Sequence, residues 1–509
     1  MDLLIGLDVG TTATKALLFD LTGRVLASAT RGYGLIVPRP GWVEQDPEEI
    51  WRAVVETLRA LGQECRARHR VVALSLSSQG GTTIPVAADG HPLYNAISWM
   101  DERACEQTEY VREKWGAEFI RTTTGWPLMN GLPLQHIGWL RQNRPAEFAA
   151  ARHFLFVNDF IIRRLTGRLC MNPSDASITQ LFNIATGDWD ERLLDIAGLT
   201  RDRLSPVYPS GQAVGELTAA ASEATGLSQD VLVVNGAHDQ YCAAVGTGVT
   251  RPGPMLLSCG TAWVILVVPD DLEAALRSGM AISCHAVQGR WGAIRSLGGV
   301  GTSLEWLLDN VWGGKDVGER RERLYEAIDK DAERSSVGAN GLFFYPPAGG
   351  HATIVGAGRG GFIGLSLAHS RGDLARAVME SIAFELRWAV EETRTKTGLK
   401  VTELTMVGGA ARSTIWPRII ADVTDVPTVI PTVKEAASRG AAILAGVGAG
   451  LFPDPEAGFK AFRGGETRLE PVAGHSVLYD DLFARYKEGY DAIRLVIEKN
   501  AAFLPRSST

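Results

Sequence analysis

The sequence has little that would place it in a specialised class of protein. It lacks a long hydrophobic run, because its longest weakly polar stretch, residues 440–452, is short and rich in glycine and alanine. A membrane span needs ~20 apolar residues. It also lacks an excess of basic residues, with 51 Lys and Arg against 58 Asp and Glu. A chain that binds nucleic acid or anionic lipid more often carries a basic face. We therefore expect no membrane and no nucleic-acid partner.

Cysteine is also scarce. The six cysteines are scattered and form no CxxC pair, which excludes a disulfide framework and a zinc knuckle and fits buried thiols in a reducing compartment. The first residues carry no basic segment and reach a carboxylate at Asp8, so they do not resemble a signal peptide. The composition is that of a globular protein, and we expect a cytoplasmic location. The 509 residues predict two or three domains, because single cores stop growing near about 250–300 residues.

Two motifs of well-known enzymes are absent, and a third is out of context. The sequence contains no GxxxxGK[ST] and no GxSxG, which disfavours a P-loop kinase and a nucleophile-elbow hydrolase. Residues 356–361 match GxGxxG, but a dinucleotide site requires a helix directly after this motif. Residues 362–367 instead indicate a strand or turn, and the next helix is predicted to begin near Asp373. A glycine turn is therefore the favoured interpretation.

The chain opens with alternating strand and turn signals. Residues 3–7, 15–19 and 24–27 are apolar and are separated by short turns, which predicts a three-stranded antiparallel meander. A helix is predicted to follow, because Asp46 is a suitable N-cap and Pro47 suits the first helical position. Three later apolar runs lead into glycine or polar turns: 71–76 into 77–81, 231–234 into 235–239, and 404–407 into 408–412. Open α/β sheets bind their ligands at such strand ends.

A second strand–turn–strand signal opens the other half of the chain. Residues 254–266 repeat the pattern of residues 3–19. Proline and glycine crowd at residues 250–254, which indicates a domain boundary. We therefore predict two similarly built domains, which cover residues 1–249 and 250–509.

The turn at residues 8–12 carries the groups that a phosphate site needs. Glycine lets the backbone approach a phosphate, hydroxyls and amides donate to its oxygens, and the Asp8 carboxylate can hold Mg²⁺ or its waters. The alternative is an ordinary hairpin turn, in which Asp and Thr are also common. The turn at Gly260 and Thr261 repeats the pattern, and this repetition favours a pair of phosphate loops.

Three further groups have two interpretations each. Asp239 can accept a proton from a substrate hydroxyl or cap a helix, and His238 is interpreted as its structural neighbour. The small residues 408–413 can let an adenine or ribose lie against the backbone, or they can serve close strand–helix packing. The third group comprises every second residue after an apolar strand: Trp99, Asp101 and Arg103. These side chains can line a binding site or form a solvated strand edge.

Several motifs together resemble the FGGY family of carbohydrate kinases, of the actin-like ATPase superfamily. Residues 360–380 are similar to the family's C-terminal signature, with GxFxGL followed after seven residues by DLxxAVME. The likeness extends from residues 5–12 to residues 435–442, and hence over nearly the whole chain. It includes ExDP at 44–47, WxDxR at 99–103 and SDAS at 174–177.

The resemblance implies an α/β fold of two RNase H-like domains, with sugar and ATP meeting in the cleft between them. The N-terminal domain would bind the sugar and supply the catalytic base, Asp239, and the C-terminal domain would bind ATP or ADP. Asp8 matches the metal-linked carboxylate, so ATP and Mg²⁺ are the implied cofactors. The other matching positions are Thr11, Thr12, Gly260 and Thr261 for the phosphates, Gly301, Glu305, Gly409, Ala410 and Ser413 for the ADP site, and Gln79, Gly80, Gly81, Trp99, Asp101 and Arg103 for the sugar. A homodimer is usual for the family.

The substrate is less sharply defined, because residues 77–82 (SSQGGT) depart from the known branches. Glycerol kinases have Arg-Glu after the glutamine, and xylulokinases have Met-His-Gly, whereas Gly80 and Gly81 supply no side-chain contact. We expect the glycines to disfavour glycerol and to leave space for a longer ketose, polyol or sugar acid. The rest of the chain resembles the xylulokinase and gluconokinase branches, which predicts a pentulose such as xylulose. Gln135 replaces a basic residue common in xylulokinases, which weakens the choice of D-xylulose.

Other functions stay open at this point. One is a gluconate, ribulose or polyol kinase of the same family. Another is an actin-like protein that binds nucleotide and sugar without catalysis, and a third is a sugar-binding protein without transfer activity. The presence of Asp8, Thr11 and Asp239 argues against a non-catalytic role, since such a protein has no need of the base.

Overall fold

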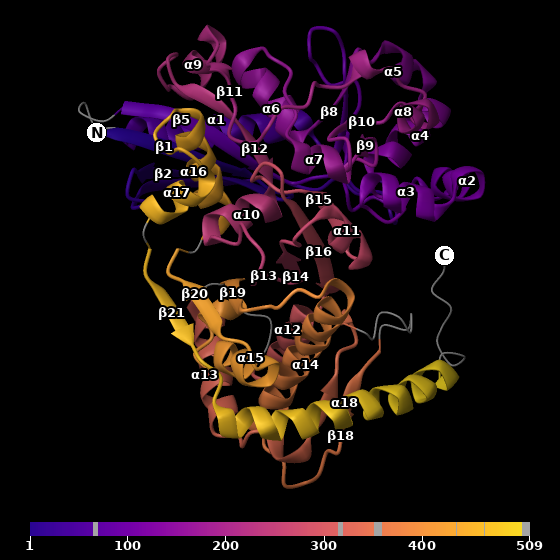
Figure 1. Cartoon of the computed structure of the whole chain (residues 1–509), viewed down its shortest axis with the longest axis vertical. Helices are drawn as coiled ribbons and strands as arrows, with labels where there is room; N and C mark the ends of the chain where they lie inside the picture. Colours follow the sequence, from indigo (N-terminus) through magenta and orange to yellow (C-terminus); the bar gives the residue numbers. More distant parts are fainter. Residues whose placement is uncertain (65–69, 314–318, 351–358, 434, 463, 501–509) are drawn as a thin grey trace. The chain divides into compact units, whose positions relative to one another are not determined.

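The computed structural model describes residues 1–64, 70–313, 319–350, 359–433, 435–462 and 464–500. The chain forms two compact units, each with both helices and strands (Figure 1). The first unit comprises Met1–Arg251, Val268–Ala293 and Glu435–Gly464, and the second comprises Pro252–Val267, Ile294–Lys434 and Gly465–Thr509. The chain therefore leaves the first unit after Arg251 and returns to it twice.

A six-stranded sheet forms the centre of the first unit, with the strand order β11-β12-β5-β1-β2-β3. The strands are β1 (Asp2–Val9), β2 (Ala13–Asp20), β3 (Val25–Gly32), β5 (Arg70–Ser78), β11 (Ala213–Glu216) and β12 (Leu232–His238). β2 pairs antiparallel with both β1 and β3, so the predicted meander is confirmed. β5 runs parallel to β1 and to β12, which brings the carboxyl ends of three strands to one edge of the sheet.

The register of these parallel strands places polar residues side by side at that edge. Asp8 on β1 pairs with Ser77 on β5, and Ser78 pairs with His238 on β12. The residues before them are mostly apolar and buried, as is typical of parallel strands that are covered on both faces. The predicted turn at residues 235–239 is wrong, because β12 continues through His238.

Two helices pack along this sheet. α1 (Pro47–Glu64) lies against β2 and β3 and begins at the predicted proline. α16 (Ala436–Gly448) lies against β1, β5 and β12, and it also packs on α10 (Asp239–Thr247). This close helix packing requires glycine, because a Cβ at Gly440 would lie 1.8 Å from the carbonyl oxygen of Cys242. The contact holds the start of α10 at the edge of the sheet.

A smaller sheet and surrounding helices complete the first unit. The small sheet has the order β4-β7-β6-β8. The further elements are β4 (Glu44–Gln45), β6 (Thr83–Val86), β7 (Ala96–Ile97), α2 (Cys105–Trp115), α3 (Ala117–Thr124), α4 (Pro133–Asn143), α5 (Pro145–Ala150), β8 (His153–Phe156), α6 (Val157–Thr166), α7 (Pro173–Ile178), β9 (Phe182–Asn183), β10 (Asp188–Trp189), α8 (Glu191–Ala197), η1 (Arg201–Arg203), α9 (Ala219–Thr225), α11 (Leu272–Arg277), β15 (Ala281–Cys284) and α17 (Pro455–Ala461). Residues 79–82, between β5 and β6, connect the large sheet to the small one.

The second unit uses the same local arrangement. Five strands of its sheet lie in the order β14-β13-β19-β20-β21. β13 pairs antiparallel with β14 and parallel with β19, as β1 does with β2 and β5. The elements are β13 (Pro254–Cys259), β14 (Trp263–Val267), β16 (Trp291–Gly298), α12 (Gly301–Val311), α13 (Glu319–Glu333), η2 (Ala339–Gly341), β17 (Phe343–Tyr345), β18 (Gly361–Ile363), α14 (Arg371–Thr397), β19 (Glu403–Gly408), η4 (Ala410–Arg412), α15 (Trp416–Thr424), β20 (Thr428–Pro431), β21 (Glu466–Leu469) and α18 (Ala473–Asn500). The predicted hairpin over residues 254–266 is confirmed.

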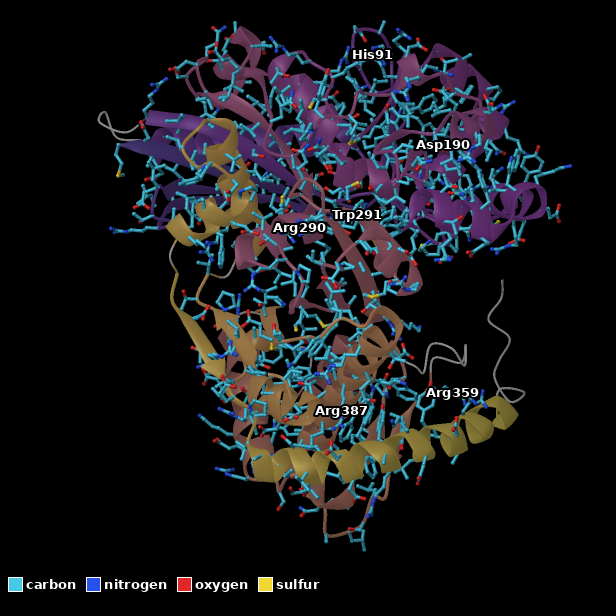
Figure 2. The ribbon with its side chains drawn as sticks, viewed as in Figure 1. His91, Asp190, Arg290, Trp291, Arg359 and Arg387 are labelled. Carbon is cyan, nitrogen blue, oxygen red and sulfur yellow. The ribbon has the colours of Figure 1, made fainter. Side chains whose placement is uncertain are left out.

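α14 forms the long central helix of this unit. Its start near Asp373 is confirmed, because Ser370 and Asp373 form a reciprocal capping box. Further along, Arg387 donates to Asp480 of α18 at 2.6 Å (Figure 2). Of the GxGxxG stretch, residues 356–358 lie outside the described residues, and β18 begins at Gly361.

Two expectations from composition can be compared with the described residues. No helix among them is long and apolar enough to cross a membrane. The five cysteines that the structure describes are free. Cys170, Cys242 and Cys259 are buried as expected, whereas Cys105 is exposed.

Candidate active site

The ends of β1 and β5 bring a carboxylate and a hydroxyl into contact. Asp8 Oδ1 accepts a hydrogen bond from Ser77 Oγ at 2.7 Å. Burial raises the pKa of Asp8 to about 6; the hydrogen bond from Ser77 opposes this rise, and the charge of Asp239 adds to it. Within the described residues, no three His, Cys, Asp or Glu side chains surround a common metal position. Mg²⁺ at phosphates usually takes only one or two carboxylates, and the Asp8 carboxylate, which is near enough to Asp239 for the charge of Asp239 to raise the pKa of Asp8, fits that role.

The turn between β1 and β2 is tied to the rest of the site by hydrogen bonds. Gln45 Nε2 donates to the Thr11 carbonyl at 2.6 Å, and Gln79 Nε2 donates to Gln45 Oε1 at 3.1 Å. Trp99 Nε1 donates to Thr11 Oγ1 at 3.1 Å. Because indole is a donor only, the threonine hydroxyl accepts this bond and can direct its own proton to a phosphate oxygen. Thr12, the next residue, is exposed.

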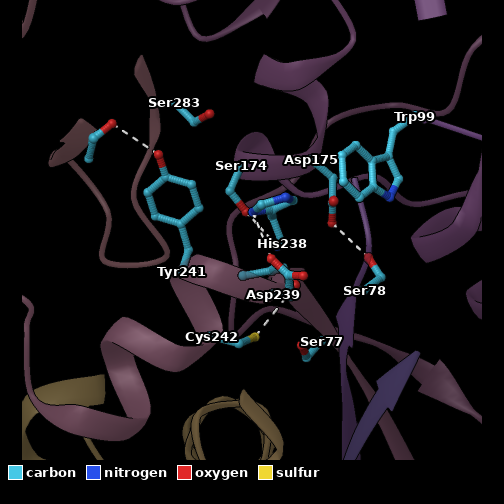
Figure 3. Close-up of polar contacts among 12 residues, drawn as sticks. Ser77, Ser78, Trp99, Ser174, Asp175, His238, Asp239, Tyr241, Cys242 and Ser283 are labelled. Carbon is cyan, nitrogen blue, oxygen red and sulfur yellow. Dashed lines mark hydrogen bonds and ion pairs between the residues drawn. The ribbon is translucent and has the colours of Figure 1, made fainter. Parts of the chain in front are cut away.

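Near the end of β5, the described side chains include three buried polar atoms without a hydrogen-bond partner: Gln79 Oε1, Asp175 Oδ1 and His238 Nδ1. Asp175 Oδ2 accepts from Ser78 Oγ at 3.1 Å and from Asn172 Nδ2 at 2.7 Å (Figure 3). Burial raises the pKa of Asp175 to about 6, and His238 opposes the rise. Since buried polar atoms are nearly always paired, each of these three atoms is available to bind a polar ligand or a buried water.

Asp239 is the first residue of α10, and its side chain is 36% exposed. One carboxylate oxygen, Oδ1, lies 3.4 Å from His238 Nδ1 (Figure 3). The alternative that Asp239 caps the helix is wrong, because His238 is the N-cap residue. The positive end of the helix favours a negative charge at this position. An accessible carboxylate held in this way can accept a proton from a hydroxyl.

The space beside Gly80 and Gly81 is filled by side chains. A Cβ at Gly80 would lie 2.5 Å from His238 Cδ2 and 2.9 Å from Ile178 Cγ2. A Cβ at Gly81 would lie 3.1 Å from Trp99 Cβ. The expectation that the two glycines leave room for a longer substrate is therefore wrong. Sequence reasoning missed the occupants because they come from other elements, His238 from β12 and Ile178 from α7.

The residues that follow β7 include a buried ion pair, Asp101 and Arg103, and an exposed tryptophan, Trp99. The Asp101 and Arg103 side chains are fully buried, and Arg103 forms ion pairs at 2.8 Å with Asp101 and with Glu44. Its guanidinium also lies 3.9 Å from the centre of the Trp42 ring. A solvated strand edge is therefore the wrong interpretation of this pair, whereas Trp99 is 47% exposed. A contact of Asp101 or Arg103 with the sugar stays a prediction.

In the second unit, the turn between β13 and β14 meets the start of α12. A Cβ at Gly301 would lie 2.5 Å from the Gly260 carbonyl and 2.8 Å from the Thr261 carbonyl, so only glycine permits this approach. Gly409 N–H donates to the Cys259 carbonyl at 2.8 Å, beside the same turn. The structure thus brings together four residues that sequence reasoning assigned to the phosphates and to ADP. A helix N-terminus beside such a turn suits an anion.

The other predicted nucleotide residues contact protein groups. Ser413 Oγ donates to Asp329 Oδ1 at 2.8 Å. Glu305 accepts a hydrogen bond from Arg321. Ala410 begins η4, directly after β19 and its following glycine. A contact of Ser413, Glu305 or Ala410 with ADP stays a prediction.

Sequence reasoning gave no role to several residues of the site, among them Asp175 and His238. Asp175 entered only as part of the SDAS motif, and His238 was interpreted as a structural neighbour. Nothing in the sequence indicates that α7 and β12 lie beside each other in the fold. The SDAS motif was the available signal for Asp175. The structure shows that this aspartate is buried near the start of α7.

Comparisons with known proteins agree with this fold. The family description "FGGY family of carbohydrate kinases, N-terminal domain" matches residues 3–246, and its C-terminal counterpart matches residues 255–449. A xylulose kinase from Staphylococcus epidermidis is 31% identical over 492 residues, which cover 96% of this chain and 96% of that protein. A gluconokinase from Bacillus subtilis is 28% identical over 448 residues, which cover 87% of this chain and 86% of that protein.

A solved structure also has this fold. The ligand-bound xylulose kinase from Lactobacillus acidophilus aligns with a TM-score of 0.85 and 26% sequence identity. The alignment covers 97% of this chain and 98% of that chain.

Proposed function

The chain belongs to the FGGY family of carbohydrate kinases, and from this premise we propose that its substrate is a neutral pentulose such as xylulose. Membership makes the chain an enzyme, a phosphotransferase with an alcohol group as acceptor, which uses ATP and a small sugar. Its fold is the two-domain α/β fold of the actin-like ATPase superfamily. The proposal adds the kind of sugar and the roles of individual residues.

The observation that carries the choice of sugar is the set of unpartnered atoms at the end of β5. Gln79 Oε1 and Asp175 Oδ1 are acceptors without donors, and the hydroxyls of an uncharged sugar can donate to both. A sugar acid would bring its carboxylate beside Asp175 and Asp239, where like charges repel. Of the cations in this unit, Arg103 and Lys15 are already paired with carboxylates. These features favour a ketose over gluconate.

We assign proton transfer to Asp239. The substrate hydroxyl oxygen bonds to the γ-phosphorus of ATP while its proton moves to the Asp239 carboxylate. The bond between the γ-phosphorus and the bridging oxygen breaks, and ADP leaves with that oxygen. A base positioned in this way is typically worth ~10²–10⁴ in rate.

In this proposal the two Gly-Thr turns stabilise the negative charge of the phosphates. Backbone amides and hydroxyls at Thr11 and Thr12 in the first unit, and at Gly260 and Thr261 in the second, donate to phosphate oxygens. Asp8 would hold Mg²⁺, which when bound neutralises part of the phosphate charge. In this proposal the first unit binds the sugar and supplies the base, and the second binds ATP.

Release of ADP in a coupled assay with Mg·ATP tests the proposal. The panel comprises D-xylulose, L-xylulose, D-ribulose, L-ribulose, gluconate, erythritol and glycerol. We expect a pentulose to give the highest kcat/KM, at least ~10-fold above gluconate, which is within the usual range of discrimination between related substrates. Preference for gluconate would contradict the choice of a neutral sugar, and transfer to no member of the panel would contradict the choice of substrate class.

A further inference from the structure

The imidazole of His238 occupies the position where a side chain at residue 80 would lie. A Cβ at Gly80 would lie 2.5 Å from His238 Cδ2 and 3.0 Å from His238 Nε2. The backbone of Gly80 does not have a positive φ, so a left-handed conformation is not the reason for glycine here. The imidazole, together with Ile178 Cγ2 at 2.9 Å from the same Cβ, therefore leaves room only for glycine at position 80.

The backbone of His238 is held from two sides. Its N–H donates to Ser174 Oγ at 2.9 Å, and its position at the end of β12 pairs it with Ser78 of β5 (Figure 3). Its ring centre lies 5.9 Å from that of Tyr241. The sheet and α7 thus hold the backbone of His238, and the ring lies near Tyr241 of α10.

The ring nitrogen nearest the base has no hydrogen-bond partner. His238 Nδ1 is buried and makes no hydrogen bond, and Asp239 Oδ1 lies 3.4 Å from it, where the two form an ion pair when the imidazole is protonated. The side chain is 11% exposed. A buried polar atom without a partner is costly, and here it lies between the two carboxylates of Asp175 and Asp239 that the sugar site contains.

We infer that the imidazole of His238 binds a hydroxyl of the sugar adjacent to the hydroxyl that Asp239 deprotonates, and that His238 is a specificity-determining residue. This inference rests on the proposed function, since it assigns a part of the same sugar site. Two groups 3.4 Å apart can contact hydroxyls on neighbouring carbons of one substrate. The imidazole binds and orients the sugar, and Asp239 alone takes the proton.

Steady-state kinetics of His238→Ala test this role, with the sugar that the wild-type enzyme phosphorylates fastest. We expect the KM for sugar to rise about tenfold, the size of one hydrogen bond to a buried polar group, while the KM for ATP is unchanged. His238→Asn, whose amide can replace the ring nitrogen, is expected to restore most of the sugar affinity. The matched control is His91→Ala, an exposed histidine of the same unit that pairs with Asp89 (Figure 2).

A double-mutant cycle with Gly80 tests the position of the ring. Gly80→Ala places a methyl where the imidazole lies, so we expect it to displace the ring and raise the KM for sugar. In the His238→Ala background the same change should add less than it does in the wild type, because the contact with the ring is gone and only the contact with Ile178 Cγ2 at 2.9 Å remains. Additive effects of the two changes would contradict the proposed contact.

Each other outcome has a definite meaning. An unchanged sugar KM in His238→Ala overturns the inference and leaves the kinase proposal standing. Equal rises in the KM for sugar and for ATP, together with a lower Tm and no rescue in His238→Asn, would also overturn it by showing a structural role. If the wild-type enzyme phosphorylates no sugar, the proposed function fails, and the inference falls with it.

Discussion

Trp99 and Thr11 are joined by a hydrogen bond in which the indole Nε1 donates to the threonine Oγ1 at 3.1 Å. Trp99 belongs to the group predicted for the sugar, and Thr11 belongs to the turn predicted to be the first phosphate loop. A second connection runs from Gln79 through Gln45 to the Thr11 carbonyl. Trp99, Gln79 and the turn at Thr11 therefore belong to one hydrogen-bonded network. We expect a substitution at Trp99 to alter the position of Thr11.

Trp99→Phe keeps an aromatic ring and removes the N–H donor. We expect the KM for ATP to rise about fivefold, because a typical hydrogen bond contributes ~1 kcal/mol, and we expect the Tm to stay unchanged because Trp99 is half exposed. Steady-state kinetics with varied ATP at saturating sugar measure this. Trp115→Phe, at another partly exposed tryptophan of the first unit, is the control. A change in the KM for sugar alone would show that the phosphate loop does not depend on Trp99.

Asp239→Asn preserves the shape of the side chain and removes its ability to accept the proton. We expect kcat to fall by ~10²–10⁴, while calorimetry shows unchanged binding of ATP. Asp230→Asn is the matched control, since Asp230 is exposed and forms an ion pair with Arg70 at 2.8 Å. Full activity of Asp239→Asn would remove the basis for calling this residue the base.

The activity should fall in acid because two site carboxylates have raised pKa values. Burial raises the pKa of Asp8 and of Asp175 to about 6, so below this pH both become neutral. Neutral Asp8 loses its attraction for a cation, and neutral Asp175 loses an acceptor for the sugar. We therefore expect kcat/KM, which reports the free enzyme, to decline as the pH falls below about 6. A profile that is flat from pH 7 to pH 5 would contradict this.

The same carboxyl groups should make the folded protein more stable at lower pH, which is the opposite of their effect on activity. A carboxyl group with a raised folded-state pKa stabilises the fold fully below its unfolded value, and this contribution is lost as the pH rises through the folded value. For Asp175, from 3.8 to about 6, the loss is at most roughly 3 kcal/mol. We expect Asp175→Asn to unfold at a higher Tm than the wild type at pH 7, with a smaller difference at pH 5. Thermal melts at both pH values measure the difference.

Gly301→Ala should disturb the second phosphate loop. The added methyl would lie 2.5 Å from the Gly260 carbonyl, so the turn or the start of α12 must move. We expect a higher KM for ATP with little change in the KM for sugar. Gly474→Ala is the matched control in the same unit, because a Cβ there meets no atom within 4 Å. If both variants keep the wild-type KM for ATP, the second loop does not contact the phosphates.

Much of the fold could be predicted from the sequence. The meander of residues 3–27, the helix that starts at Pro47 and the second hairpin at residues 254–266 are all local patterns of apolar alternation and turn residues. The prediction failed at residues 235–239, where glycine and polar residues indicate a turn. There β5 pairs with β12 and keeps the strand extended through His238, which no local pattern indicates.

For the site, sequence reasoning identified the loop residues and the carboxylates, and the structure adds what lies between them. The resemblance assigned Asp8, Asp239 and both Gly-Thr turns by motif. It treated Gly80 as free space, whereas the His238 ring lies there. It gave no role to the unpartnered atoms of Asp175 and His238, because hydrogen-bond satisfaction depends on the neighbours of an atom in space.

The sequence by itself determined the two hairpins at residues 3–19 and 254–266, the helix that starts at Pro47 and the family that the chain resembles, because these properties depend on residues close together in the chain. Only the tertiary structure decided which side chains are in contact. Ser77 and Ser78 contact Asp8 and Asp175, and His238 fills the space beside Gly80, because the register of distant strands brings them together. The chemistry that we propose for the sugar site depends on that register, because the register sets which groups lie beside the imidazole of His238.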